Sequence, residues 1–201
     1  MIAAAAAALI AAGTTPVARA QDSAAATEGA QFVSSLASRA VTELTTGDLA
    51  MADRVLRFRS MLTEAFDVPT IARFVLGRYW RIATDAEKAE YLKLFEDFIV
   101  QTYIQRFNDF AGAQLRVLNT RSAQDGEVIA TLDAVLPGKP TARFDVRMRR
   151  EAGAFKIFDV VVEGISMSVT QRDDFAAVIQ RNGGKVEGLL ASLREKTRNV
   201  Q

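Results

Sequence analysis

Residues 84–110 read TDAEKAEYLKLFEDFIVQTYIQRFNDF, and residues 142–149 read ARFDVRMR. In the first stretch Thr84 and Glu87 form a capping box, and the apolar residues that follow recur with the period of a helix. These apolar residues cover more of the circumference than a surface helix needs, so we expect a helix up to about Phe110 that is covered on two sides or lines a cavity. In the second stretch apolar and charged residues alternate, which predicts a strand with one dry and one wet face.

The residues before Gly112 predict helices at residues 31–44 and 49–66, and a short third helix that follows Asp67 and ends near Gly77. Asp67 stands where an N-cap is expected, with Pro69 in the first turn of the third of these helices, where its missing N–H costs little.

After Gly112 the period changes to two, and turn signals at Asp125-Gly126, residues 137–140 and Gly153 separate four strands. The last strand, residues 155–162, has apolar residues on both faces, so we expect it to be covered on both sides or bulged. Helical periodicity returns at Ser166. The order predicts an α+β domain in which an antiparallel meander is curved around and covered by helices.

The composition excludes several classes of function. The chain has 201 residues, with 25 Lys+Arg, 24 Asp+Glu, no cysteine and no histidine. Without these two residue types it can form no disulfide, no cysteine or histidine metal site and no Ser-His-Asp triad. A net charge of +1 gives no electrostatic reason to expect nucleic-acid binding. We predict no catalytic residue, no metal site and no cofactor.

Residues 1–20 resemble a secretory signal peptide. An Ala-rich apolar run is followed by Ala18-Arg19-Ala20, an A-x-A site that predicts cleavage after Ala20. The mature chain, residues 21–201, is then expected to be one exported domain. No Lys or Arg precedes the apolar run, so either the true start lies upstream or the signal is atypical, and a disordered Ala-rich tail is the alternative.

Two blocks of sequence resemble the MlaC-type family of periplasmic phospholipid-shuttle proteins, also called toluene-tolerance auxiliary proteins. The first is FDVPTIARFVLGRYWR at residues 66–81, followed by the capping box. The second is FDVVVEGIS at residues 158–166, followed by QRDDF at 171–175 and RNGG at 181–184. Together these blocks span nearly all of the mature chain in the order of the family.

The resemblance implies a monomeric carrier that holds one phospholipid, with its acyl chains buried in an apolar cavity between a curved sheet and helices. It also implies transfer between an inner-membrane ABC transporter complex and an outer-membrane lipoprotein complex, which maintains outer-membrane lipid asymmetry. A hopanoid or other lipid is the alternative cargo. The exact cargo, the direction of transport and the residues that contact partners stay open.

Apolar residues of the helix at 84–110, of the strands and of the segment at 75–80 are the candidates for the cavity wall, because an acyl chain needs only apolar burial. Close packing of the same residues in a filled core is the alternative. The lipid-binding candidates are Val75, Leu76, Tyr79, Trp80, Phe95, Phe98, Ile99, Tyr103, Val128, Leu132, Phe144, Val146, Met148, Ile157 and Val160.

Arginines accompany these candidates. Arg73, Arg78 and Arg81 flank Tyr79-Trp80, and either meet a lipid phosphate or an acidic partner, or form a solvated face paired with Asp67 and Asp85. Those at 143, 147, 149 and 150 are expected on the wet strand face, where they either dock a transporter subunit or keep the strand soluble.

Two rival functions were weighed against a lipid carrier. A small hydrolase would use Ser166 or a carboxylate pair, but Ser166 lacks a histidine partner, so we interpret it as a strand-to-helix junction. The pair Asp173-Asp174 is expected near a helix N-terminus, where it complements the dipole. An envelope module that only bridges proteins is the other rival.

Overall fold

The computed structural model describes residues 16–45, 49–104, 113–136, 138 and 140–198. The described elements follow the predicted order of helices, meander and helices. They are α1 (Pro16–Thr45), α2 (Met51–Ala65), α3 (Val68–Leu76), the 3-10 helix η1 (Gly77–Arg81), α4 (Asp85–Ile104), β1 (Gln114–Ser122), the 3-10 turn η3 (Gln124–Gly126), β2 (Glu127–Val135), β3 (Ala142–Glu151), β4 (Ala154–Val162), β5 (Ile165–Ser166), α5 (Met167–Arg181) and α6 (Val186–Thr197).

The strands form one antiparallel sheet in the order β1-β2-β3-β4-β5. The hairpin predicted between β1 and β2 turns on Asp125 at φ 57° and Gly126 at φ 71°, the left-handed region that this dipeptide favours. Pairing between β2 and β3 is unbroken from Glu127–Arg149 to Ala134–Ala142. The α+β class and the meander are therefore confirmed, and the short β5 is an addition that the sequence pattern did not reveal.

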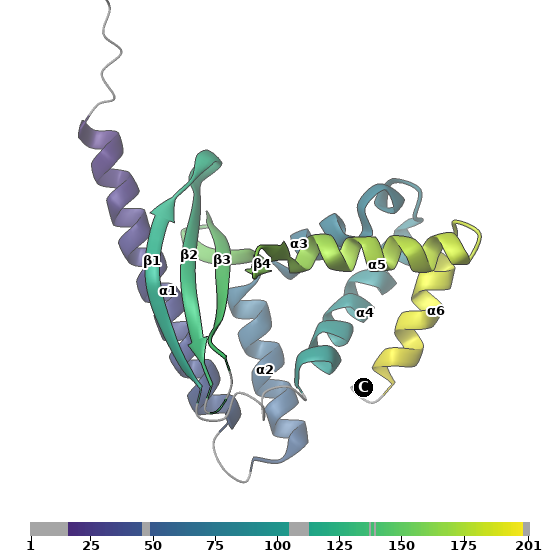
Figure 1. Cartoon of the computed structure of the whole chain (residues 1–201). Coiled ribbons are helices and arrows are strands. Elements are labelled where there is room, and N and C mark those ends of the chain that lie inside the picture. Colours follow the sequence, from purple (N-terminus) through teal and green to yellow (C-terminus); the bar gives the residue numbers. More distant parts are fainter. Residues whose placement is uncertain (1–15, 46–48, 105–112, 137, 139, 199–201) are drawn as a thin grey trace, which may run out of the picture.

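Helix α1 packs along the inner face of the sheet (Figure 1). Gly29 is buried at this contact, where a Cβ would lie 2.8 Å from Val128 Cγ1, so the missing side chain lets the helix approach. The predicted helix at 31–44 is the C-terminal part of α1, which starts earlier because its Ala-rich beginning has high helix propensity. The buried residues of this sheet core are Val33, Val128, Ala130, Leu132, Val146, Met148, Phe155 and Ile157.

The outer face of the sheet carries cross-strand ion pairs. Arg143 Nε lies 2.9 Å from Asp133 Oδ1, and Arg147 Nε lies 2.5 Å from Glu127 Oε1. Arg150 does not belong to this face, although the sequence pattern placed it there. It lies over the ring of Phe155 and pairs with Glu28 of α1, so it closes one end of the sheet core.

Strand β4 is bulged at Phe158, one of the two options predicted for it. Arg147 pairs with Asp159 and Met148 pairs with Ile157, so Phe158 is the extra residue. Its ring lies on the outer face, with the guanidinium of Arg147 5.2 Å from its centroid. The bulge leaves Ile157 and Val160 on the same inner side of the sheet.

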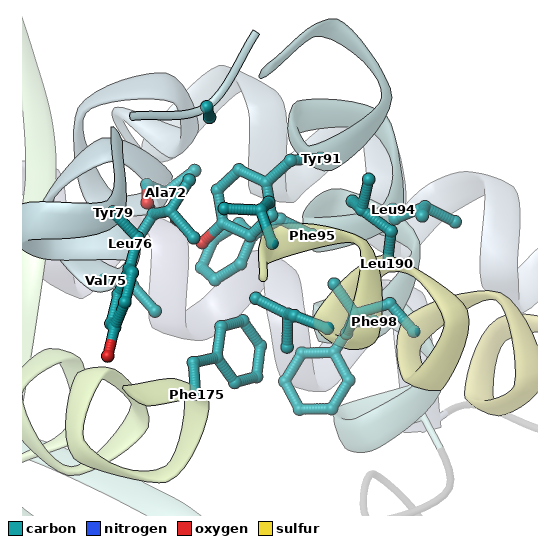
Figure 2. Packing of buried hydrophobic residues seen from close by; sticks show 14 of the residues in the cluster. Ala72, Val75, Leu76, Tyr79, Tyr91, Leu94, Phe95, Phe98, Phe175 and Leu190 are labelled. Atoms are coloured by element: carbon teal, nitrogen blue, oxygen red, sulfur yellow. Dashed lines mark hydrogen bonds between the residues drawn. The ribbon is translucent and has the colours of Figure 1, made fainter. Parts of the chain in front are cut away.

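The helices α2 to α6 form a second core beside the sheet. Figure 2 shows Tyr91, Phe95 and Phe98 of α4 gathered around Phe175 of α5. The ring centroids of Phe98 and Phe175 are 5.5 Å apart in an edge-on arrangement. The hydroxyl of Tyr91 donates to the carbonyl of Ala72 at 2.9 Å, and burial raises the pKa of Tyr91 well above its usual range.

The predicted helix boundaries are confirmed where a side chain caps the helix. The backbone N–H of Thr70 donates to Asp67 Oδ1 at 3.1 Å, and Thr84 and Glu87 exchange the hydrogen bonds of a capping box. The predicted end of the long helix at Phe110 lies outside the described residues. The placement of Asp173 near a helix N-terminus is wrong, because α5 begins at Met167 and the first turn holds no acidic residue.

Candidate functional site

A cavity of about 330 Å³ lies where β4 meets four of the helices. Each of these elements contributes three residues to its wall, and most of them are apolar. The lining residues are Phe58, Leu62 and Phe66 from α2 and its C-cap, Val68, Ile71 and Val75 from α3, Phe95, Ile99 and Tyr103 from α4, Asp159, Val160 and Val162 from β4, and Met167, Ser168 and Gln171 from α5.

The junction between α2 and α3 fixes one side of this cavity to the sheet. The backbone N–H of Asp67 donates to the carbonyl of Ile157 at 2.9 Å, and Arg149 Nη2 donates to Asp67 Oδ2 at 3.0 Å. Burial opposes the charge on Asp67, but hydrogen bonds from Thr70 and Arg149 outweigh it and hold the pKa of this carboxyl below its usual range. One carboxylate therefore both caps α3 and ties it to β3.

An ion-pair cluster between α2 and α4 supports another part of the cavity wall. Arg59 Nη1 lies 2.6 Å from Glu96 Oε1, and Arg59 Nη2 lies 2.6 Å from Asp97 Oδ1. Arg59 follows Phe58 and Glu96 follows Phe95 in the chain, and both aromatic residues line the cavity. The cluster therefore sets the spacing of the two helices next to the apolar wall.

Two of the polar residues in the lining, Asp159 and Ser168, are hydrogen-bonded within the protein. Asp159 Oδ1 accepts from the backbone N–H of Ser168 at 3.1 Å, and Asp159 Oδ2 accepts from the hydroxyl of Ser166 at 2.7 Å. The Ser166 hydroxyl in turn accepts from the N–H of Val169, so Ser166 is the N-cap of α5. This confirms the prediction of a strand-to-helix junction, and the hydrogen bonds leave the cavity with an apolar character.

Five of the predicted lipid-binding residues lie on the cavity wall. They come from α3, α4 and β4, and are Val75, Phe95, Ile99, Tyr103 and Val160. The structure thus brings together residues up to 85 positions apart in the sequence, from position 75 to position 160. Their contact with a ligand stays a prediction.

The structure places the other ten away from this cavity. Leu76, Tyr79, Trp80 and Phe98 belong to the helical core, with Trp80 half-buried at its edge. Val128, Leu132, Phe144, Val146, Met148 and Ile157 belong to the sheet core. For the sheet residues the physical reason is that α1, admitted by Gly29, packs on the inner face of the sheet, mainly against β1 and β2.

The lining residues that the sequence analysis did not select come mostly from α2 and the start of α5. Phe58, Leu62 and Phe66 follow a helical stripe, and that spacing identifies a buried face without revealing that the face borders a cavity. Met167 and Gln171 lie one turn apart on α5, and no pattern in the sequence distinguishes them from core residues.

The arginines near Tyr79 are not paired as expected. Asp67 binds Arg149, and Asp85 binds Lys88 at 3.1 Å, so neither neutralises Arg73, Arg78 or Arg81. Arg78 Nη2 instead donates to the hydroxyl of Tyr79 at 2.9 Å, which lowers the pKa of Tyr79.

In the parts of the chain that the structure describes, no three acidic side chains gather in a way that could hold a metal ion. Nor does any helix in those parts combine the length and the apolar composition that crossing a bilayer requires.

The chain is similar to known proteins over most of its length. The family model described as MlaC protein matches residues 32–195. The intermembrane phospholipid transport system binding protein MlaC of Haemophilus influenzae is 19% identical over 125 residues, which make up 60% of this chain and 58% of that relative. The match thus spans less than two thirds of the curated relative.

A solved structure shares the fold. It is the phospholipid-binding protein from Ralstonia solanacearum in complex with a phospholipid, with a TM-score of 0.72 and 20% identity over 85% of this chain and 97% of that chain. At this identity the likeness establishes the arrangement of helices and sheet. Because the family model matches most of its residues, this chain belongs to the MlaC protein family.

Proposed function

We propose that this protein binds a phospholipid with an acyl chain in the cavity between β4 and helices α2 to α5, and that it carries the lipid without chemical change. The observation that carries the proposal is a cavity with a mostly apolar wall, in which the one carboxylate, Asp159, is hydrogen-bonded within the protein. Membership in the MlaC family and the phospholipid in the complex of the Ralstonia solanacearum protein support it.

The size of the cavity limits what it holds in this conformation. At about 30 Å³ for a water-sized group, a volume of about 330 Å³ has room for about eleven methylenes. Their burial contributes roughly 9 kcal/mol before the costs of binding, at about 0.8 kcal/mol each. One acyl chain therefore fits in part, and a lipid with two chains requires the walls to move apart or the second chain to lie along the opening.

The experiment is to fill the cavity and measure the bound lipid. Ile99→Trp and Val162→Trp each place a large ring where the wall leaves space. Leu118→Trp is the matched control, because Leu118 is 48% exposed on β1 and does not line the cavity. Mass spectrometry under non-denaturing conditions measures co-purified lipid, and uptake of labelled phospholipid from vesicles measures loading.

We expect both cavity variants to lose bound lipid while their unfolding midpoints stay at or above that of the control, since the ring fills a void. Lipid retained at the control level in both variants would place the lipid elsewhere. A protein that is purified empty and takes up no lipid would remove the proposal.

We further propose the finer role that the resemblance implies. After removal of residues 1–20 the chain acts in the periplasm, and it exchanges phospholipid between an inner-membrane ABC transporter complex and an outer-membrane lipoprotein complex. Residues 1–15 lie outside the described residues. A hopanoid or other polycyclic lipid is the alternative cargo, because the wall of the cavity selects apolar surface and no head group, and the same mass measurement identifies it.

A further inference from the structure

The outer side of α3 and η1 presents charged and apolar side chains together. We define the α3–η1 surface as Arg73, Phe74, Arg78, Trp80, Arg81, Ile82 and Arg172. Phe74 is 42% exposed and Ile82 is 66% exposed, and both lie next to exposed arginines. Arg172 of α5 joins the surface because its guanidinium lies 5.0 Å from the centroid of the Phe74 ring.

The positive charge of α3 and η1 on this surface is not neutralised, whereas Arg172 Nε of α5 lies 3.8 Å from Asp173 Oδ1. Residues 68–84 contain no Asp or Glu, and Arg73, Arg78 and Arg81 form no ion pair with any residue that the structure describes. Arginines elsewhere behave differently, since Arg59, Arg143 and Arg147 all contact carboxylates. The exposed guanidinium groups of Arg73, Arg78 and Arg81 are therefore available to bind phosphate, which a guanidinium matches with two parallel N–H groups.

Trp80 adds the third component of an interfacial surface. Its ring is half-buried between cations, with the guanidinium of Arg73 5.8 Å and the ammonium of Lys88 5.9 Å from its centroid. Rings of this kind, with an apolar body and a polar edge, are enriched at the level of lipid head groups. Exposed aliphatic and aromatic side chains next to Arg are the composition of a segment that lies on an anionic bilayer.

The position of the surface fits contact with lipid. Helix α3 lines the cavity with Ile71 and Val75 and presents Phe74 to solvent. Helix α5 likewise contributes Gln171 to the cavity and Arg172 to the α3–η1 surface. The surface is therefore the outer side of two walls of the cavity. We propose that the α3–η1 surface docks on a phospholipid bilayer that carries net negative charge.

The test uses vesicle flotation together with fluorescence. Trp80 is the only tryptophan in the chain, so its emission reports on this surface alone. With vesicles of phosphatidylglycerol and phosphatidylcholine in equal parts, the protein should float and its emission should shift to the blue. Vesicles of phosphatidylcholine alone, or high salt, should abolish both signals, because exposed charges are screened within about 3 Å at 1 M salt.

Arg78→Gln/Arg81→Gln should weaken vesicle binding roughly 25-fold, at about fivefold for each arginine near the membrane surface. Phe74→Ser/Ile82→Ser should also weaken it and leave its salt dependence unchanged. The matched control is Arg116→Gln/Arg121→Gln, which removes the same charge from exposed positions on β1 and should bind as the wild type does.

Two results would overturn the proposal. One is that the wild-type protein does not float with the anionic vesicles. The surface would then be assigned to an acidic protein partner. The other is that the variant Arg78→Gln/Arg81→Gln binds anionic vesicles as strongly as the control variant does. Lipid content measured on the same preparations keeps this test separate from the proposed function: a chain loaded with lipid that does not float contradicts docking alone, and a chain that floats but never holds lipid contradicts the cavity proposal alone.

Discussion

Gly29→Ala tests whether helix α1 closes the inner face of the sheet. A Cβ at this position would lie 2.8 Å from Val128 Cγ1 and 3.6 Å from both Met148 Sδ and Thr120 Cγ2. Carbon atoms in good contact are about 3.5–4.0 Å apart, so the helix or the strand must move by about 0.7 Å to admit one methyl group.

Two effects of opposite sign determine how much Gly29→Ala changes the free energy of unfolding. Adding a methyl to a packed contact costs about 1–3 kcal/mol, and replacing Gly by Ala inside a helix returns about 1 kcal/mol. We therefore expect Gly29→Ala to lower the free energy of unfolding by about 0–2 kcal/mol. In a chain that also carries Val128→Ala the nearest atom is gone, and the same change at Gly29 should stabilise the protein by up to about 1 kcal/mol.

The assay is urea unfolding of the four chains of this double-mutant cycle, with midpoints compared at equal slope. The expected coupling energy between the two sites is about 1–3 kcal/mol. A coupling of zero, with Gly29→Ala stabilising in both backgrounds, would refute the packing of α1 on the sheet. The inner face of β2 and β3 would then be open to a ligand, and Val128 and Met148 would again be candidates for the wall of a lipid-binding cavity.

Three further predictions concern the supports of the cavity, each measured by urea midpoints. Asp67→Ala should cost about 1–3 kcal/mol through the lost cap and ion pair with Arg149. Because folding lowers the pKa of Asp67, that contribution is present above the unfolded value of about 3.9 and is lost as pH falls through the folded value, so wild type and variant should converge in acid. Tyr91→Phe should cost about 1 kcal/mol, since the Ala72 carbonyl loses a buried donor. Ser166→Ala should cost about 1 kcal/mol as a lost N-cap; an unchanged midpoint in any variant would contradict its assignment.

The sequence predicted those parts of the fold that depend on neighbours a few residues apart. Asp67 caps α3 through the N–H of Thr70, and Thr84 and Glu87 cap α4, because each contact spans three positions. The Asp125-Gly126 turn follows from backbone preference alone. The period of two likewise identified the dry faces of the strands, and with them the α+β class.

The same period could not predict what covers a dry face. Val146 and Val160 are directly paired across β3 and β4, yet Val146 is buried in the sheet core while Val160, at the edge of that core, also borders the cavity. The difference arises because α2, α3 and α5 contact β4, and these contacts join residues far apart in the chain. The apolar face of α2 formed by Phe58, Leu62 and Phe66 could not be assigned from the sequence either. Apolar residues have the same helical spacing whether their face borders a core or a cavity.

Docking and loading can be separated because α3 presents different residues to its two sides. Its orientation is fixed at one end by the ion pair of Asp67 and along its length by the hydrogen bond from Tyr91, so the cavity side and the outer side do not exchange. The variant Arg78→Gln/Arg81→Gln should therefore retain bound lipid but no longer bind anionic vesicles. Ile99→Trp should lose bound lipid but still bind the vesicles. If Ile99→Trp also lost vesicle binding, the bound lipid rather than the protein surface would make the contact, and the α3–η1 surface would have no docking role of its own.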